Sequence, residues 1–433
     1  MDEKRLKIQQ KLYALLLCSV VFTVVYNYTA WHISALPEVP SFVFDFEKYI
    51  PFIPWTIIPY MTSGLFFYLV FFLCTNKEQL KVLTQRMLFV TIIAGISFLL
   101  FPLKFSLQKP DIENFILRYS FQFLKTFDSP FNQAPSLHIS YALIFWSVFR
   151  TLQKGRTFLL LLLILLGFST LTTYQHHGID IITGAILSHI SFIIFPYRKK
   201  DFQYRNFHVA NFYFLSAWMF ILTALLLNQF SGQPGLILLW PALMNFCIGY
   251  HYQKDNTYFL KDRNGNISWI KKIFYFPYLL MYRIFWRLLR KNKTPVEPVS
   301  RIYISSKPDQ ETLKYFKADK NTFVYDLSPE IEENLLLKEQ ANYFFRPILD
   351  IGTFDLERTQ SLITEISRTH RHLPEDGKIL IHCTMGFTRS SVIGILVIKN
   401  ILSLPLEGAI TIMKTSNKHI IIHSYLQDFL KKF

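Results

Sequence analysis

The chain has 433 residues, of which 51% are hydrophobic, and its formal net charge is +16. The apolar residues are concentrated before about residue 252, which excludes a single small soluble domain. The positive charge could indicate nucleic acid, but basic and aromatic residues are not interleaved as base-binding surfaces require, so no nucleic-acid partner is expected.

Eight apolar runs in the first part of the chain are close to the ~20 residues that cross a bilayer. They predict an all-α polytopic membrane domain over residues 1–250, with about eight transmembrane helices. The first run is interpreted as a retained anchor, because no small-residue cleavage site follows it. The runs are Leu12–Ile33, Pro54–Cys74, Leu88–Leu103, Ser136–Thr151, Phe158–Tyr174, Ile179–Pro196, Asn211–Asn228 and Gly235–Tyr250.

Charged residues between the runs indicate their orientation. Segments rich in Lys and Arg, such as those at 77–86, 150–156 and 198–205, alternate with segments that have almost none. The positive-inside rule then places both termini in the cytoplasm. The loop at 104–135 breaks this rule, because it is expected outside and yet is basic, which suggests a functional reason for its charge. Its cations are Lys104, Lys109, Arg118 and Lys125.

Ionisable residues at membrane depth are costly, and three of them stand out as a candidate site. His176 and Asp180 have helical i, i+4 spacing, and His138 follows Pro135-Ser136-Leu137. The expected topology places all three at the outer ends of their spans, beside the basic loop. A nucleophilic histidine oriented by an aspartate, with a second histidine as general acid, can transfer a phosphoryl group.

This pattern resembles the type 2 phosphatidic acid phosphatase superfamily over residues 12–196. The resemblance implies that His176 is the nucleophile, oriented by Asp180, and that His138 protonates the leaving group. It also implies that Ser136 binds phosphate, with Lys104 and Lys109 as substitutes for the missing lysine-arginine motif.

Two departures from the family pattern leave the activity open. Leu137 stands in place of a glycine, and Thr170 stands in place of an arginine. The loss of that arginine resembles the sphingolipid headgroup-transferase branch. The outer site is therefore expected to be a phosphatase, a lipid headgroup transferase or an inactive remnant, and polar residues satisfied inside a helix bundle are the plain structural alternative.

Residues 251–299 are expected to join two domains. Trp269–Lys293 mixes aromatic and aliphatic residues with Lys and Arg, and its uncharged core is too short to span a bilayer. We predict a basic interfacial helix lying on anionic lipid, followed by a linker at 293–298.

The four cysteines have neither CxxC nor metal-ligand spacing, so no disulfide framework, metal or other cofactor is predicted. Cys383, however, lies between a strand pattern at 378–382 and a helix pattern from Ser390 onward, with Gly386 and Arg389 between them. A loop of this length can surround a phosphate with main-chain N–H groups and stabilise a thiolate. Arg389 can grip two phosphate oxygens, and Ser390 can donate to the sulfur as it leaves.

The run from His382 to Ser390 resembles the signature of dual-specificity phosphatases, and the resemblance covers residues 300–433. It implies an α/β fold, a phosphocysteine intermediate and a loop aspartate upstream that protonates the leaving oxygen. Asp350 matches that aspartate, and Asp355 is the alternative. The loop lacks the lysines of phosphoinositide phosphatases, which disfavours an inositol polyphosphate and leaves a phosphoprotein or a lipid phosphomonoester as the substrate.

The sequence therefore predicts a multi-domain enzyme that hydrolyses phosphoric monoesters and resembles bacterial inner-membrane proteins in which these two families are fused. A cytoplasmic cysteine site and an outward-facing histidine site would act on phosphorylated lipids or phosphoproteins, with membrane lipids as further partners. Two alternatives stay open. The membrane half could be a headgroup transferase, or it could be an inert anchor for a phosphoprotein phosphatase.

Overall fold

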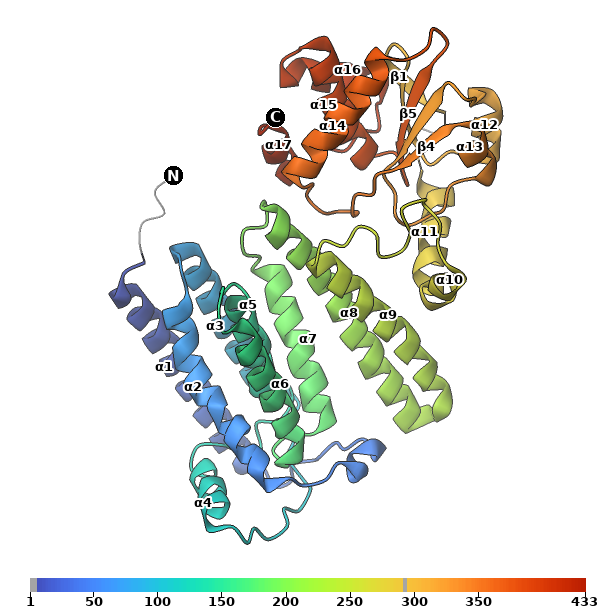
Figure 1. Ribbon diagram of the computed structural model, residues 1–433. Coiled ribbons are helices and arrows are strands. Elements are labelled where there is room, and N and C mark those ends of the chain that lie inside the picture. Colours follow the sequence, from blue (N-terminus) through green and yellow to red (C-terminus); the bar gives the residue numbers. More distant parts are fainter. Residues whose placement is uncertain (1–5, 291–293) are drawn as a thin grey trace. The chain divides into compact units, whose positions relative to one another are not determined.

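The computed structural model describes residues 6–290 and 294–433, and within these the chain forms two compact units. The first extends to Tyr197 and includes residues 211–245. The second comprises residues 198–210 and 246–433. The first unit is helical and the second contains a mixed sheet, so the predicted multi-domain fold, an α-helical membrane bundle followed by an α/β domain, is confirmed (Figure 1).

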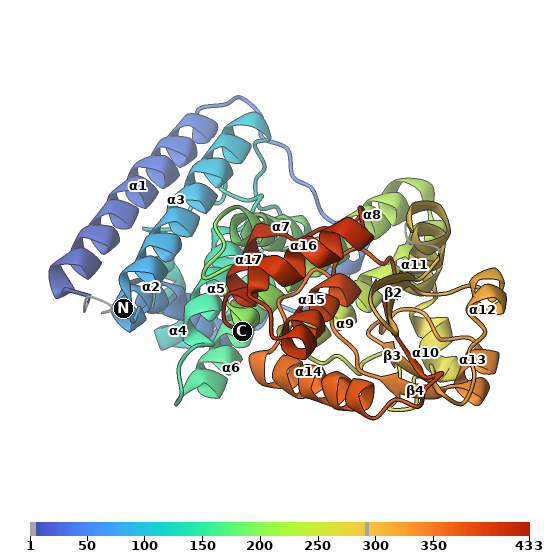
Figure 2. The same ribbon diagram turned by 90° about the horizontal axis from the view of Figure 1, so that it is seen from above.

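The first unit is built from long apolar helices that run side by side (Figures 1 and 2). Within the described residues, four helical segments are long and apolar enough to cross a membrane: Ile8–Ser34, Pro54–Leu73, Lys77–Leu100 and Phe202–Ser231. Three shorter apolar helices pack among them. The chain is therefore a membrane protein. The helices wholly in this unit are α1 (Ile8–Ser34), α2 (Ile57–Leu73), α3 (Lys77–Leu100), α5 (Leu137–Phe149), α6 (Arg156–Thr172) and α7 (Gly178–Ile194). Two further helices, α8 (Phe202–Ser231) and α9 (Leu239–Gln253), contribute their residues 211–231 and 239–245 to it.

Helix α3 begins earlier than expected, and the predicted start at Leu88 is wrong. The side chain of Asn76 accepts a hydrogen bond from the main chain of Gln79, which caps the helix before its first residue, Lys77. Arg86 is consequently inside the helix and buried rather than in a basic loop. Its guanidinium donates to the main-chain oxygen of Phe195, at 3.1 and 2.8 Å, which removes the cost of burying the group without a partner.

The segments at the ends of α2, α6 and α7 form an ordered rim. It includes a 3-10 helix at Asp45–Tyr49, helix α4 (Phe115–Leu124) and a bridge between Leu103 and Asn132. The unexpectedly basic loop at 104–135 thus contains regular structure. This rim carries the candidate histidine site.

The second unit contains the sheet and also residues 251–299, the segment expected to join the two domains and here called the junction. The expected interfacial helix is two helices, α10 (Trp269–Phe274) and α11 (Phe276–Leu289), and Pro277 lies in the first turn of α11. The linker expected at 293–298 is wrong in its second half, because β1 (Val296–Val299) is a strand. Lys293 lies outside the described residues.

The sheet has five strands in the order β1-β2-β5-β3-β4. The pairs β2–β5, β5–β3 and β3–β4 are parallel, and β1 is antiparallel to its neighbour. The central strand β5 is buried along its length, as its apolar run predicts. The remaining strands are β2 (Ile302–Ser306), β3 (Thr322–Asp326), β4 (Asn342–Phe345) and β5 (Lys378–Cys383).

Helices cover both faces of this sheet (Figure 1). On one face α14 (Leu356–Arg371), α15 (Arg389–Leu402) and α16 (Leu406–Ser416) form the larger apolar core with α17 (Ser424–Leu430). On the other face α12 (Gln310–Phe316) and α13 (Leu335–Gln340) form a smaller core. The carboxyl end of β5 leads into the N-terminus of α15, and the cysteine loop connects the two elements.

Candidate functional site

The cysteine loop curls around the sulfur of Cys383, the last residue of β5. The main-chain N–H of Gly386 donates to Sγ at 3.3 Å, and the hydroxyl of Ser390 lies 3.4 Å from the same atom. Ser390 is in the first turn of α15, so the positive end of the helix dipole faces this sulfur. An amide, a hydroxyl and a helix N-terminus, the kinds of group that bind anions, therefore meet at this sulfur.

Gly386 is required by the shape of the loop. Its φ of +78° lies in the left-handed region that side chains disfavour. A Cβ at this position would also lie 2.7 Å from the main-chain nitrogen of Ser306, at the end of β2. Only glycine lets the loop pass this close to the sheet.

Arg389 is brought to the same loop and is nearly completely buried. Its Nε lies 3.5 Å from Oδ1 of Asp350, the predicted general acid. Its Nη1 donates to Oε1 of Glu330 at 2.9 Å. Burial alone would lower the pKa of Arg389, but the carboxylates of Asp350 and Glu330 raise it well above its usual range. The guanidinium is therefore held as a cation beside Cys383.

Glu330 was missed in the sequence and lies at the centre of this arrangement. It is buried, and its Oε2 accepts a hydrogen bond of 2.6 Å from the hydroxyl of Thr384 in the cysteine loop. Thr384 in turn accepts from Nη2 of Arg389 at 3.2 Å. Glu330 thereby orients the arginine and ties it to the loop. No motif surrounds Glu330 in the sequence, so no local signal could have singled it out.

Asp350 rather than Asp355 faces the cysteine loop. The carboxylate of Asp355 caps helix α14, because it accepts a hydrogen bond of 2.8 Å from the main chain of Arg358. Asp350 is contacted instead by the junction: the hydroxyl of Tyr282 donates to its Oδ2 at 3.2 Å, and that of Tyr252 donates to its main-chain oxygen at 3.2 Å.

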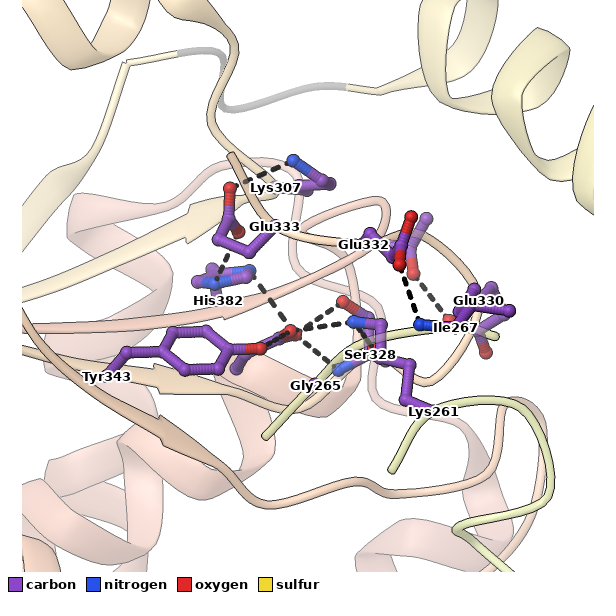
Figure 3. Close-up of polar contacts among 12 residues, drawn as sticks. Lys261, Gly265, Ile267, Lys307, Ser328, Glu330, Glu332, Glu333, Tyr343 and His382 are labelled. Atoms are coloured by element: carbon purple, nitrogen blue, oxygen red, sulfur yellow. Dashed lines mark hydrogen bonds and ion pairs between the residues drawn. The ribbon is translucent and has the colours of Figure 1, made fainter. Parts of the chain in front are cut away.

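Behind the loop, a set of buried charges surrounds His382, the residue before the cysteine (Figure 3). One nitrogen of His382 lies 3.1 Å from Oε2 of Glu333, and the other lies 3.8 Å from Oδ1 of Asp326. Each carboxylate holds a lysine: Lys261 binds Asp326 at 2.8 Å, and Lys307 binds Glu333 at 2.9 Å. Lys261 comes from the junction, before α10.

These charges fix the protonation of the two carboxylates. Burial opposes ionisation, but the ammonium of Lys261 and the neighbouring His382 lower the pKa of Asp326 far below its usual value. In the same way, Lys307 and His382 overcome the effect of burial and lower the pKa of Glu333 to about 2. One possible ligand atom from each of Asp326, Glu333 and His382 lies within 4.8 Å of the other two, as metal ligands would. Two ammonium groups already neutralise the carboxylates, so we interpret the set as an ion-pair network.

The histidine site lies in the first unit, at the rim. Nδ1 of His176 is 3.2 Å from Oδ2 of Asp180, and Nε2 of His176 is 3.4 Å from Nδ1 of His138. Close packing of α5 on α7 brings them together, because a Cβ on Gly184 would lie 2.6 Å from the main-chain oxygen of Ser136. The three residues predicted from their spacing therefore meet.

The neighbouring His177 is turned away from His138. Its Nδ1 lies 2.8 Å from Oε2 of Glu47, and its Nε2 accepts a hydrogen bond from the main chain of Ser106 at 3.2 Å. His176, the histidine with helical spacing to Asp180, is therefore the one of the two that faces His138.

Asp128 is a second residue that the sequence did not reveal. Its carboxylate accepts hydrogen bonds from the hydroxyls of Tyr26 and of Tyr60, the latter at 2.6 Å. The hydroxyl of Tyr60 also lies 3.4 Å from Nδ1 of His138. Asp128, His138 and His176 line a cavity of about 420 Å³, whose remaining wall is mostly apolar and comes from α1, α2, α4, α5 and the segment after α4.

The predicted phosphate-binding residues of the first unit are not among those that line this cavity. Ser136 is buried and caps α5 by accepting a hydrogen bond from Ile139. The ammonium of Lys109 lies over the rings of Phe105 and Phe121, and its burial lowers the pKa of Lys109 to about 8. Lys104 donates its main-chain N–H to Pro40. Phosphate binding by these three residues stays a prediction.

Comparison with known proteins covers both parts of the chain. Residues 8–194 match the model of the PAP2 superfamily. No curated protein matches the chain significantly. Among solved structures, Tk-PTP in its active form is 21% identical, with a TM-score of 0.29, 32% of this chain covered and 95% of that one.

Two human proteins are similar over the same share of the chain. DUSP28 is 14% identical, with a TM-score of 0.27 and coverage of 33% of this chain and 94% of that one. The tyrosine phosphatase-like serine/threonine/tyrosine-interacting protein is 13% identical, with a TM-score of 0.28 and coverage of 32% and 95%. The match of residues 8–194 to the PAP2 superfamily agrees with the resemblance expected there, and both the joining of that family to a cysteine phosphatase and the hydrolase activity stay predictions.

Proposed function

We propose that this chain is a membrane-bound phosphatase with a cysteine site and a separate histidine site. At the cysteine site, Sγ of Cys383 attacks the phosphorus of a phosphomonoester and forms an S–P bond. The bond between phosphorus and the leaving oxygen breaks, and Asp350 gives that oxygen its proton. Water then attacks the phosphocysteine, Asp350 takes back a proton, and inorganic phosphate leaves.

The single observation that carries this proposal is the convergence on Cys383 of three groups that phosphoryl transfer needs. The Gly386 amide and the Ser390 hydroxyl approach the sulfur, and the Arg389 cation lies between the loop and Asp350. Donors of this kind stabilise charge on the phosphoryl oxygens as it develops in the transition state.

For the histidine site we propose hydrolysis of a lipid phosphate. His176, held by Asp180, would attack phosphorus through Nε2 and form an N–P bond while the bond to the leaving oxygen breaks and His138 protonates that oxygen. Water would then attack the phosphohistidine, His138 would take a proton from that water, and inorganic phosphate would leave. The apolar wall of the cavity supports a lipid substrate, because acyl chains could lie against α1, α2 and α4. Ser136, Lys104 and Lys109 are proposed to help bind the phosphate.

A specific observation favours the second candidate, headgroup transfer from a phosphodiester lipid to a hydroxyl. Asp128 brings a carboxylate to the cavity, and neither Lys104 nor Lys109 is among its lining residues. A carboxylate repels a phosphate dianion more strongly than a diester monoanion. The absence of the family's arginine, whose place Thr170 takes, also favours headgroup transfer. Thr170 is buried next to the site, because its main-chain oxygen accepts a hydrogen bond from the N–H of His176 at 3.1 Å.

The proposal assigns residues 1–250 to the membrane domain, 251–299 to the junction and 300–433 to the phosphatase domain. Both termini and Cys383 would be cytoplasmic, where a reducing environment protects the thiol, and the histidine site would face outward. A bacterial inner membrane is the proposed location. Each site would then act on its own substrate.

One substrate panel tests these assignments. Wild type, Cys383→Ser and His176→Ala are assayed in parallel on p-nitrophenyl phosphate, a phosphotyrosine peptide, phosphatidic acid and a diester lipid with an alcohol acceptor. We expect Cys383→Ser to abolish hydrolysis of the soluble phosphomonoesters, and His176→Ala to abolish one lipid activity while sparing them. If His176→Ala leaves every lipid activity intact, the membrane half is an inert anchor. If Cys383→Ser retains full phosphatase activity on soluble substrates, the cysteine mechanism is wrong.

A further inference from the structure

Helices α10 and α11 of the second unit present a continuous apolar face. Leu288 is 74% exposed and Trp269 is 70% exposed, values that are unusual for large apolar side chains. In α11 the exposed positions recur with helical spacing, which puts them along one side. The exposed apolar residues are Trp269, Ile270, Ile273, Phe276, Leu280, Met281, Ile284, Phe285, Leu288 and Leu289.

The opposite side of α11 is buried in the second unit and reaches the cysteine site. Tyr278, Leu279 and Tyr282 are buried, and Tyr282 donates to the carboxylate of Asp350 at 3.2 Å. One turn further, the indole of Trp286 donates to the main-chain oxygen of Lys307 at 3.0 Å. The helix therefore has one apolar outer face and one inner face that holds the candidate general acid.

The charges on α10 and α11 are of one sign. Residues 269–290 contain no Asp or Glu, and Arg283 and Arg287 are exposed beside the apolar positions. This combination of an apolar face with flanking cations matches the boundary of an anionic bilayer, where acyl chains meet acidic headgroups. Along the chain α9 ends at Gln253 and α10 begins at Trp269, so a short segment joins this face to the helices that precede it.

We propose that the outer face of α10–α11 docks on an anionic bilayer, and that the Cys383 site behind it acts on phosphomonoesters of lipids in that same leaflet. An α-helix with its side chains is about 10–12 Å across. Asp350 and Arg389, on the inner side, would thus lie about one helix diameter from the lipid boundary, within reach of a headgroup phosphate. This inference rests on the cysteine phosphatase proposed above and selects lipid phosphate over phosphoprotein as its substrate.

The test uses the full chain in lipid nanodiscs, in a His176→Ala background so that only the cysteine site acts. The double variant Ile284→Glu/Leu288→Glu places carboxylates on the outer face without touching Asp350. We expect this variant to hydrolyse phosphatidic acid in an anionic disc at least about tenfold more slowly, because the lipid phosphate is no longer positioned at the site. Its hydrolysis of soluble p-nitrophenyl phosphate should change less than about twofold. The matched control is Tyr315→Glu, at an exposed aromatic residue of α12, which should change neither rate.

A second measurement reports docking directly. Brominated acyl chains should quench tryptophan fluorescence in the discs, and part of that quenching should disappear in Trp269→Phe. Docking is overturned if Trp269→Phe removes no quenching, or if the double variant lowers both rates equally. The substrate assignment is overturned if the wild-type site cleaves a phosphotyrosine peptide but no lipid phosphate. Absence of p-nitrophenyl phosphate hydrolysis in every variant would overturn the cysteine phosphatase itself.

Discussion

The guanidinium of Arg389 donates to the carboxylate of Glu330 at 2.9 Å, although the two residues are 59 positions apart in the chain. This ion pair fixes the plane in which the arginine presents its remaining N–H groups to a phosphate. We expect Glu330→Gln to raise KM for p-nitrophenyl phosphate roughly tenfold with a smaller fall in kcat, because substrate binding and orientation weaken while the nucleophile remains. Steady-state kinetics measure both constants.

The control for this prediction is Glu339→Gln, because Glu339 lies in α13 and does not belong to the Glu330–Arg389 pair. If Glu330→Gln changes neither constant, Glu330 does not orient Arg389. A loss of folded protein would instead be visible in the midpoint of thermal unfolding, which separates positioning from stability.

Asp350→Asn is expected to slow the cysteine site to an extent that depends on the leaving group. A general acid contributes about 10²- to 10⁴-fold, and it is needed most when the leaving oxygen is strongly basic. Hydrolysis of an alkyl phosphate should therefore fall about 10³-fold, and hydrolysis of p-nitrophenyl phosphate much less. Equal losses on both substrates would contradict the assignment, and Asp355→Asn is the matched control.

Lys261→Met should destabilise the second unit, because it leaves the buried carboxylate of Asp326 without its cation. Breaking a buried ion pair costs about 3–5 kcal/mol. In a unit of this size such a loss corresponds to a fall of about 10 °C in the thermal midpoint of the p-nitrophenyl phosphate activity. The double variant Lys261→Met/Asp326→Asn should recover most of the loss. A single variant as stable as wild type would show that the ion pair contributes nothing.

The same network predicts a sensitivity to acid. The pKa of Glu333 is lowered from 4.5 to about 2, and that of Asp326 is lowered as well. A depressed carboxylate pKa gives stability that is fully present above the unfolded-state value and is lost as pH falls through the folded-state value. The unfolding midpoint should therefore decline from about pH 4.5 downward. Glu333→Gln should flatten this decline, and an unchanged slope would exclude the network as its cause.

Asp128→Asn tests the histidine site. The hydroxyl of Tyr60 contacts both the carboxylate of Asp128 and the imidazole of His138. The negative charge of Asp128 would therefore attract the positive charge that His138 carries when it acts as a general acid. We expect the lipid activity that depends on His176 to fall roughly tenfold, with Asp45→Asn, at an exposed position of the same rim, as control. A rise in phosphatidic acid hydrolysis would instead indicate that Asp128 repels the phosphate.

The parts of this molecule that sequence could predict are those with local signals. Apolar runs indicated the helices of the first unit. The spacing from Cys383 to Arg389 and the spacing from His176 to Asp180 indicated the two sites, because each pair is held by a short loop or a single helical turn.

The parts that sequence could not predict depend on contacts between distant segments. The start of α3 was missed because a charged residue such as Arg86 is interpreted as loop when its buried partner is unknown. Glu330, Asp128 and Lys261 were missed because each meets its partner only through folding, with no motif around it.

The junction also bears on how such a chain can be divided and recombined. A fragment starting at Ser300, where the family resemblance begins, would lack Lys261, which neutralises Asp326, and Tyr282, which holds Asp350. The carboxylates of Asp326 and Asp350 would then lack the partners that the longer chain gives them. A piece that keeps these contacts must begin at or before Lys261, and it contains the whole second unit only if it begins by Arg198. Exchange of the phosphatase among relatives should therefore succeed only when the preceding helices travel with it.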